Sequence, residues 1–385
     1  MIPPSRPRVF VSSVVEGFAV YREAARKAIE QIGGEAVLVN EDSGAQRVSS
    51  RNACLDAVDS ADIFLLVIAT RGGWRTPSGR LVVEEELEQA RRRSLPILVL
   101  IEDGDQDADA KRLSKAVSDY VDGYFRAHFE GPGGLGRELA RALQPVIEMY
   151  QKSAMSPDAV LDYFKRTYKI GEETTLRFVL VPERQEEVID PVRLASAAFA
   201  ERLLELGHAK SIAMFSYFRA KEFPAILQDA LILEQPASSD RRHGLQAVRV
   251  EVHESGAIVI DANVTGQRES ANSSDMMSSF RIASEDLDLA LAIDFRFANG
   301  VFEELDPYKR HQRFYWNAAL RSLGYRSFAR NPQPSQSYSM DTSQRKEPFM
   351  AFPDGRLIDR LILAQPVREI ERAVHAWTRK QGRET

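Results

Sequence analysis

The stretch VVEEELEQARRRSLPILVLI, residues 82–101, contains the pattern that decides the fold. Val83, Leu87, Ala90 and Ser94 recur at the i, i+4, i+7 spacing of a helix with one buried face. The last six residues of the stretch are almost continuously apolar, which is typical of a strand buried on both faces of a parallel sheet. A helix that leads directly into such a strand predicts an α/β fold.

Glu86 is the candidate catalytic residue of this helix. Its neighbours one turn away on either side are Val82 and Ala90, which place its carboxylate at the edge of the buried stripe. Glu85 and Glu88 point away from that stripe and are expected to be solvated. A partly buried carboxylate near a helix start can serve the helix dipole or a functional site. The spacing alone leaves both interpretations open.

Residues 8 to about 152 alternate between predicted strands and helices. The expected strands are 8–12, 35–39, 63–69, 96–101 and 124–129, and the expected helices are 16–32, 51–61, the acidic helix, one ending at 121, and 135–150. Five strands joined by crossover helices predict a doubly wound, flavodoxin-like parallel sheet. Ligands bind beyond the carboxyl ends of such strands, where Ser12, Ser13, the loops 40–50 and 71–80 and the start of the Glu86 helix all fall.

Composition limits the possible classes of protein. A chain of 385 residues is long enough for two domains, predicted at 1–152 and 158–385 with a linker between them. The net charge of −5 excludes a global basic field of the kind that dominates nucleic-acid binding, although a local basic patch stays possible. With one cysteine and six scattered histidines, neither a disulfide nor a metal site is expected. No apolar run of about 20 residues is present, so we expect a soluble, cytoplasmic protein.

The second half is predicted to be an α+β domain. Its expected elements are a strand at 176–181, a helix at 192–205, a hairpin of 248–253 with 257–264, a strand or helix at 287–297, and a loop at 331–347. Residues 308–323 are predicted to form an amphipathic helix that carries Phe314, Tyr315 and Trp316 beside several basic residues. Its aromatic side belongs either to the core or to a surface that binds single-stranded nucleic acid.

Several short motifs of the first half resemble a bacterial TIR-like family found at the N-terminus of predicted defence and signalling proteins. The resemblance covers about residues 8–150. It is carried by Val9-Phe10-Val11-Ser12-Ser13, Tyr21-Arg22, Cys54-Leu55, Asp62, Arg71-Gly72-Gly73-Trp74, Val83-Glu84-Glu85-Glu86-Leu87 and Leu95-Pro96-Ile97-Leu98-Val99. The chain departs from the family at Gly72, where tyrosine is common, and at Leu87, where an aromatic residue is common.

The resemblance implies chemistry at an N-glycosidic bond, because TIR domains and nucleoside deoxyribosyltransferases use a glutamate on the helix after the third strand. Glu86 occupies that place. The resemblance further implies that Ser12 and Ser13 contact ribose or phosphate, that Arg71 pairs with a phosphate, and that Trp74, in one loop with Gly73, covers a base. NAD+ is then the substrate, and no cofactor is expected.

The leading hypothesis is an NAD+ glycohydrolase that acts as the effector of a bacterial antiviral defence system. Its second half would sense an activating trigger or mediate self-association. One alternative is a nucleoside or nucleotide glycosyl hydrolase or transferase on the same fold. Another is a non-enzymatic TIR-like assembly module, in which Glu86 is ordinary surface.

Overall fold

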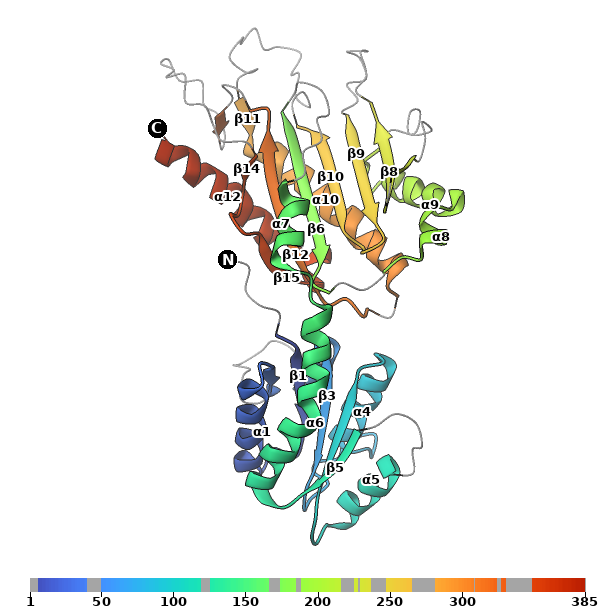
Figure 1. Ribbon diagram of the computed structural model, residues 1–385, viewed down its shortest axis with the longest axis vertical. Helices are drawn as coiled ribbons and strands as arrows, with labels where there is room; N and C mark the ends of the chain where they lie inside the picture. The colour runs from blue at the N-terminus through green and yellow to red at the C-terminus, as the bar shows by residue number, and fades with distance from the viewer. Residues whose placement is uncertain are drawn as a thin grey trace. The chain divides into compact units, whose positions relative to one another are not determined.

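The computed structural model describes residues 6–39, 50–118, 125–165, 174–184, 188–215, 225–227, 229–236, 247–264, 281–307, 309–323, 327–329 and 348–384 (Figure 1). The chain divides into two compact units, and the main break between them falls between Ala154 and Met155. No helix among the described residues is long and apolar enough to cross a membrane.

The first unit is built on a five-stranded parallel sheet with the strand order β2-β1-β3-β4-β5. Its strands are β1 (Arg8–Ser12), β2 (Glu35–Val37), β3 (Ile63–Ile68), β4 (Ile97–Glu102) and β5 (Phe125–Phe129). Each neighbouring pair is parallel. Every residue of β3 and β4 is buried, as their apolar runs predict. The predicted α/β class and the parallel sheet are therefore confirmed.

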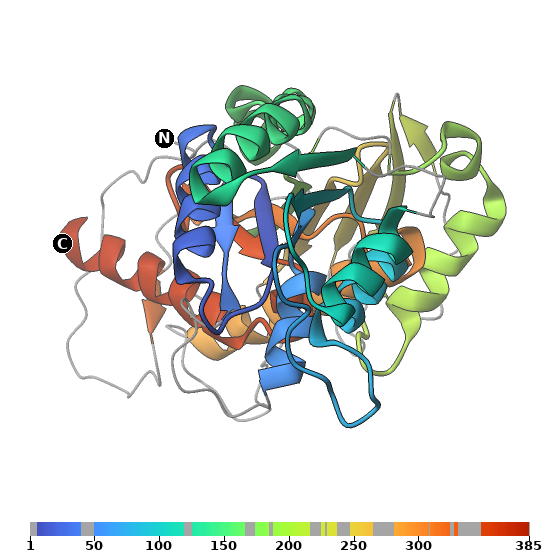
Figure 2. The ribbon, with the colours of Figure 1, turned by 90° about the horizontal axis from the view of Figure 1, so that it is seen from below.

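Successive strand residues point to opposite sides of the sheet, and in β3 and β4 the residues on both sides are buried. Helices accordingly cover both faces of this sheet. Figure 2 shows α1 (Ala19–Gln31) and α6 (Gly131–Ser153) lying side by side on one face. Their apolar residues pack with Val9 and Val11 of β1. On the other face, α3 (Ser50–Asp59), α4 (Val82–Arg92) and α5 (Ala108–Ser118) pack with Phe10 and with alternate residues of β3 and β4.

The expected element boundaries shift by a few residues. Helix α1 begins at Ala19 rather than at residue 16, because Gly17 adopts a positive φ of 80° and ends the preceding loop in a turn. Strand β2 is shorter than predicted. Helix α6 begins at Gly131, four residues early, with Pro132 in its first turn, where proline is well tolerated.

The second unit contains, within the described residues, an eight-stranded antiparallel sheet. Its order is β14-β12-β6-β10-β9-β8-β7, and β15 also pairs with β12. The strands are β6 (Thr175–Pro182), β7 (Ala225–Leu227), β8 (Ala230–Gln235), β9 (Val248–His253), β10 (Ile258–Asn263), β12 (Arg313–Arg321), β14 (Phe349–Met350) and β15 (Arg356–Asp359). Two short strands, β11 (Arg281–Ala283) and β13 (Ser327–Ala329), form a separate parallel pair. The predicted hairpin is present as β9 and β10.

Helices also cover both faces of the second sheet (Figure 1). They are α7 (Pro157–Lys165), α8 (Pro191–Leu194), α9 (Ala197–His208), α10 (Ser284–Leu305), α11 (Leu361–Ala364) and α12 (Val367–Glu384). The main core lies between the sheet and α9, α10 and α12, while α7 packs on the opposite face. The helix expected at 192–205 is divided in two, since Ser196 caps the start of α9 by accepting a hydrogen bond from the Phe199 backbone.

The prediction of a helix at 308–323 is wrong. Residues Arg313–Arg321 form β12, which lies inside the sheet and pairs with β6. Phe314, Trp316, Ala318 and Leu320 belong to the main core, and this every-second-residue pattern belongs to a strand. The segment expected to be strand or helix at 287–297 lies within α10. The loop predicted at 331–347 lies outside the described residues.

Candidate active site

A cavity of about 700 Å³ lies at the carboxyl ends of the parallel strands in the first unit. Its wall comes from β1 and the loop after it, from α1, α3 and α4, and from the loops that follow β2, β3 and β4. The lining residues are Phe10, Val11, Ser13, Val14, Val15, Glu16, Arg22, Val39, Arg51, Cys54, Arg71, Gly73, Trp74, Thr76, Val82, Val83, Glu86 and Asp107. The loop 40–49, which the sequence also assigns to this end of the sheet, lies outside the described residues.

Glu86 reaches this cavity from the buried side of α4. Only 6% of Glu86 is exposed. The residue is therefore buried, whereas the sequence predicts a position at the edge of the apolar stripe. Ser12, the last residue of β1, donates a hydrogen bond of 2.6 Å from its hydroxyl to Oε2 of Glu86. The structure thus brings together the predicted catalytic residue and one predicted substrate contact.

Burial dominates the electrostatics of this carboxyl group. It raises the pKa of Glu86 from 4.5 to about 7, although hydrogen bonds from Ser12 and Cys54 and the charge of Arg22 favour the ionised form. Glu86 therefore exchanges between its neutral and charged forms near neutral pH. Burial and the neighbouring Glu86 raise the pKa of the Cys54 thiol to about 12. The thiol consequently stays protonated and acts as a hydrogen-bond donor to the carboxylate.

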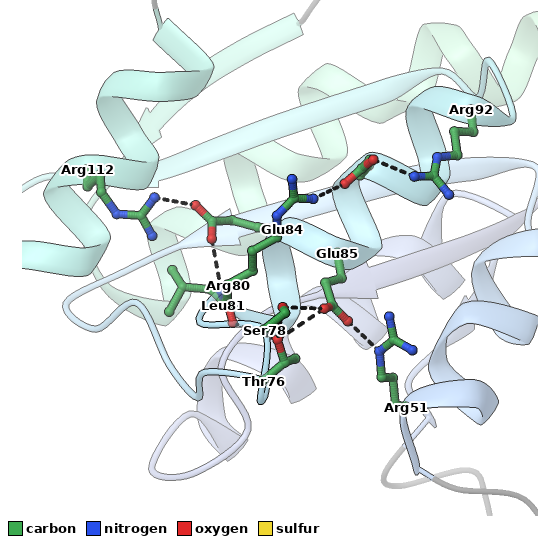
Figure 3. A network of polar contacts seen from close by, with 10 residues as sticks. Arg51, Thr76, Ser78, Arg80, Leu81, Glu84, Glu85, Arg92 and Arg112 are labelled. Atoms are coloured by element: carbon green, nitrogen blue, oxygen red, sulfur yellow. Dashed lines mark hydrogen bonds and ion pairs between the residues drawn. The ribbon is translucent and has the colours of Figure 1, made fainter.

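The other acidic residues of α4 are not among those that line the cavity. Arginines bind them instead (Figure 3). Arg112 donates a hydrogen bond of 2.6 Å to Glu84, which also accepts one of 2.8 Å from the Leu81 backbone. Glu85 accepts a hydrogen bond of 2.6 Å from Arg51 and others from Thr76 and Ser78. Glu88 pairs with Arg80 and Arg92. The turn of the helix thus directs Glu86 into the cavity, while the other three carboxylates form ion pairs outside it.

Two further cavity residues, Ser13 and Arg22, contact each other, which the sequence does not predict. The Arg22 guanidinium donates a hydrogen bond of 3.1 Å from Nη1 to the Ser13 hydroxyl. Arg22 is 4% exposed and shares the inward side of α1 with Ala25 and Ile29. A charged residue at an inward-facing position of α1 is the sequence signal for Arg22, whose place in the Tyr21-Arg22 motif implies no role by itself.

The loop between β3 and α4 places Arg71, Gly73 and Trp74 at the cavity. Arg71 donates a hydrogen bond of 2.7 Å from Nη2 to the backbone carbonyl of Glu16, and its guanidinium lies 5.4 Å from the centroid of the Phe18 ring. Gly73 adopts a φ of 91°, a conformation that favours glycine. Trp74 is 80% exposed, so its indole is a rim residue and not part of the core.

Asp107 anchors the same loop from its other side. Its carboxylate accepts hydrogen bonds from the backbone N–H groups of Gly72, at 3.1 Å, and of Ala110, at 2.7 Å. The position of Gly72 leaves no room for a side chain, because a Cβ atom would lie 2.5 Å from that of Asp109. The glycine at this departure from the TIR-like pattern is therefore required by the packing. Among the described residues, no group of three or more metal-binding side chains is arranged to hold a metal ion.

Comparison with known protein families identifies a domain in the first unit. Residues 8–144 match the family described as Domain of unknown function (DUF4062). The match includes every residue that lines the cavity, so the chain carries this cavity within a DUF4062 domain. Comparison with curated proteins finds no match for the chain.

Proposed function

We propose that the first unit is an NAD+ glycohydrolase, which cleaves the bond between nicotinamide and ribose. The observation that carries this proposal is the buried carboxyl of Glu86 in a cavity at the carboxyl ends of parallel strands. A volume of about 700 Å³ is within the range of small-molecule sites and suits a nucleotide. The TIR-like resemblance of the surrounding motifs supports the same chemistry.

The chemistry requires little acid catalysis. The nicotinamide of NAD+ carries a positive charge, so it departs as a neutral molecule when its bond to the anomeric carbon breaks. The enzyme mainly has to stabilise the positive charge that develops on the ribose. Ionised Glu86 supplies the opposite charge, and Ser12 fixes its orientation. Water then attacks the anomeric carbon and releases one proton to solvent.

The remaining predicted contacts fit around this centre. Ser13 lines the cavity, and we assign a ribose or phosphate oxygen to it, while Trp74 at the rim can cover a base together with the backbone of Gly73. Arg71 uses Nη2 to hold the carbonyl of Glu16, and we assign its other guanidinium nitrogens to a phosphate of the substrate.

Substitution of Glu86 by Gln tests the proposal. It keeps the shape of the side chain and removes the charge, so nicotinamide release from NAD+ should fall by about a hundredfold or more. Release is measured by chromatography with mass detection. Glu88→Gln is the matched control, because Glu88 is on the same helix but pairs with Arg80 and Arg92 outside the cavity. Equal activity of Glu86→Gln and wild type would reject the proposal.

The raised pKa of Glu86 favours a second candidate, the hydrolysis of neutral nucleosides. A neutral base leaves more easily when an acid protonates it, and a carboxyl with a pKa of about 7 is partly protonated at neutral pH. The two candidates predict opposite pH dependences. NAD+ cleavage should rise as the pH increases through about 7, whereas nucleoside cleavage by protonated Glu86 should fall.

The wider role follows from the resemblance alone and is likewise a proposal. We assign the NAD+ glycohydrolase to a bacterial antiviral defence system in the cytoplasm, with the second unit receiving a trigger or mediating self-association. Constitutive NAD+ loss would be toxic, so turnover by the full chain should be slow at rest and rise on activation. A non-enzymatic assembly module would show no turnover under either condition.

A further inference from the structure

Arg22 is a buried cation in the cavity wall that the proposed reaction does not yet use. It comes from the first turn of α1, is 4% exposed and lines the same cavity as Glu86. Nη1 of Arg22 donates to the Ser13 hydroxyl at 3.1 Å, and the adjacent Ser12 hydroxyl donates to Glu86 at 2.6 Å. Two consecutive serines at the end of β1 therefore connect the guanidinium with the carboxylate.

The charges around the cavity explain why this cation matters. Burial opposes a charge on Glu86, and so does the neighbouring Glu85, while Ser12, Cys54 and Arg22 favour it. Arg22 also favours ionisation of the Cys54 thiol against burial and against Glu86. The other charged residues that line the cavity are Glu16, Arg51, Arg71 and Asp107. Of these, Arg51 is bound to Glu85, Arg71 to the Glu16 carbonyl, and Asp107 to the backbone of Gly72 and Ala110.

We propose that Arg22 is a positioning residue that holds Ser13 by a hydrogen bond and supplies a buried positive charge to the cavity of Glu86. The inference rests on the proposed function, in which the ionised carboxylate is the working form. Arg22 acts through Glu86 and Ser13 and need not touch the reacting atoms. An arginine suits this task because its guanidinium stays charged at any working pH and can bond one neighbour while facing another.

The direct test measures the ionisation of Glu86 without using activity. The protein is labelled with ¹³C at the glutamate carboxyls, and the Glu86 signal is identified by its loss in Glu86→Gln. In Arg22→Gln the pH midpoint of that signal should move upward, because the positive charge of Arg22 favours the ionised carboxylate. Arg22→Lys keeps the charge and should move the midpoint much less. An unchanged midpoint in folded Arg22→Gln would overturn the proposal.

A milder variant covers the case in which Arg22→Gln does not fold. Ser13→Ala leaves Arg22 in place but removes the hydroxyl that holds its guanidinium at 3.1 Å. The midpoint of Glu86 should then shift upward by a smaller amount. Circular dichroism establishes that each variant is folded. If Arg22→Gln is unfolded and Ser13→Ala leaves the midpoint at its wild-type value, Arg22 serves only to support the loop.

The pH profile of turnover gives a second readout that separates the two proposals. If wild type cleaves NAD+, the acid side of its profile should move upward in Arg22→Gln and return towards wild type in Arg22→Lys. A lower kcat with an unchanged profile would indicate a structural role and count against the inference. If wild type shows no NAD+ cleavage either at rest or on activation, the proposed function fails, while the carboxyl titration still decides the role of Arg22.

Discussion

At Glu86, burial and the proposed chemistry act in opposite directions. The proposed NAD+ cleavage requires a charged carboxylate, yet burial raises the pKa of that group from 4.5 to about 7. A neutral carboxyl is what burial favours, and the charged form is held in place by Ser12, Cys54 and Arg22. Such a conflict is common at functional sites, where stability is given up for reactivity.

This conflict predicts that Glu86→Gln stabilises the protein at alkaline pH. Above about pH 7 the folded chain holds a buried charge that the unfolded chain exposes to water. Glu86 then lowers the free energy of unfolding by roughly 3 kcal/mol relative to a neutral amide, at about 1.4 kcal/mol for each unit between 4.5 and about 7. Below pH 4.5 the carboxyl is protonated in both states, so the difference should vanish.

Urea denaturation at pH 8.5 and at pH 4 measures this difference. Glu88→Gln is the control, since its carboxylate lies on the exposed side of α4 and forms surface ion pairs. A Glu86→Gln protein that is destabilised equally at both pH values would show that the carboxyl contributes to the fold and not only to the cavity.

The sequence distinguishes Glu86 from the other carboxylates of α4, but it does not show which side chains contact Glu86. Helical phase separates Glu86 from Glu85 and Glu88 because the period of α4 is regular and its apolar residues mark one side. The partners Ser12, Arg22 and Cys54 come from β1, α1 and α3, which are far from Glu86 in the sequence. Their distances depend on tertiary packing, which no local pattern encodes. The depth of burial was likewise underestimated, because α4 alone does not show what covers it.

At the level of elements, the strands and helices of the first unit were predictable because each has a clear period. Buried parallel strands appear as apolar runs, and the helices between them carry single apolar stripes. For strand β12 in the second unit, the same reasoning predicts a helix and is wrong. Its residues are buried on both faces, including Arg313, which is paired with Glu183 at 2.9 Å. Aromatic and basic residues in one segment then imitate an amphipathic helix.

Trp316 is a core residue of strand β12. Trp316 is fully buried between Phe178, Phe295 and Phe352, so Trp316→Ala should lower the free energy of unfolding of the second unit by about 3–5 kcal/mol. Leu361→Ala is the control, because Leu361 is 72% exposed. Thermal unfolding of both variants is followed by far-ultraviolet circular dichroism, whose signal comes from the backbone and not mainly from the tryptophan that is removed. A loss below about 1 kcal/mol for Trp316→Ala would contradict the position of β12 in the core.

At the scale of the whole molecule, the two units have separate cores. The two apolar clusters of the first sheet contain only residues from Val9 to Ile147, and those of the second begin at Met155. Each unit therefore buries its own apolar surface, as an independent domain does. The predicted domain limits of 1–152 and 158–385 remain to be tested by expression.

A fragment of residues 1–154 should fold alone and unfold in one cooperative transition. It retains the whole sheet and all of α6, which ends at Ser153. Differential scanning calorimetry of the fragment is the measurement, and the full chain should show a matching transition beside a second one. A fragment that exposes hydrophobic surface and lacks a transition would show that the first unit needs the rest of the chain.

The arginines around α4 have a consequence for how the protein responds to its solution. Arg51 from α3 and Arg112 from α5 each hold one carboxylate on the outer side of this helix. These pairs are accessible to ions, and the Debye length at physiological ionic strength is only about 8 Å. Added salt therefore weakens the attachment of the helix while the buried contacts of Glu86 are screened much less.

Ionic strength should accordingly change the position of the Glu86 carboxylate before it affects the stability of the fold. Increasing potassium chloride is expected to reduce NAD+ turnover at concentrations that leave the melting temperature unchanged. Arg112→Gln, which lacks the pair with Glu84, should begin with lower turnover and lose less of it on addition of salt. A parallel fall of turnover and melting temperature would instead show that salt acts on the whole domain.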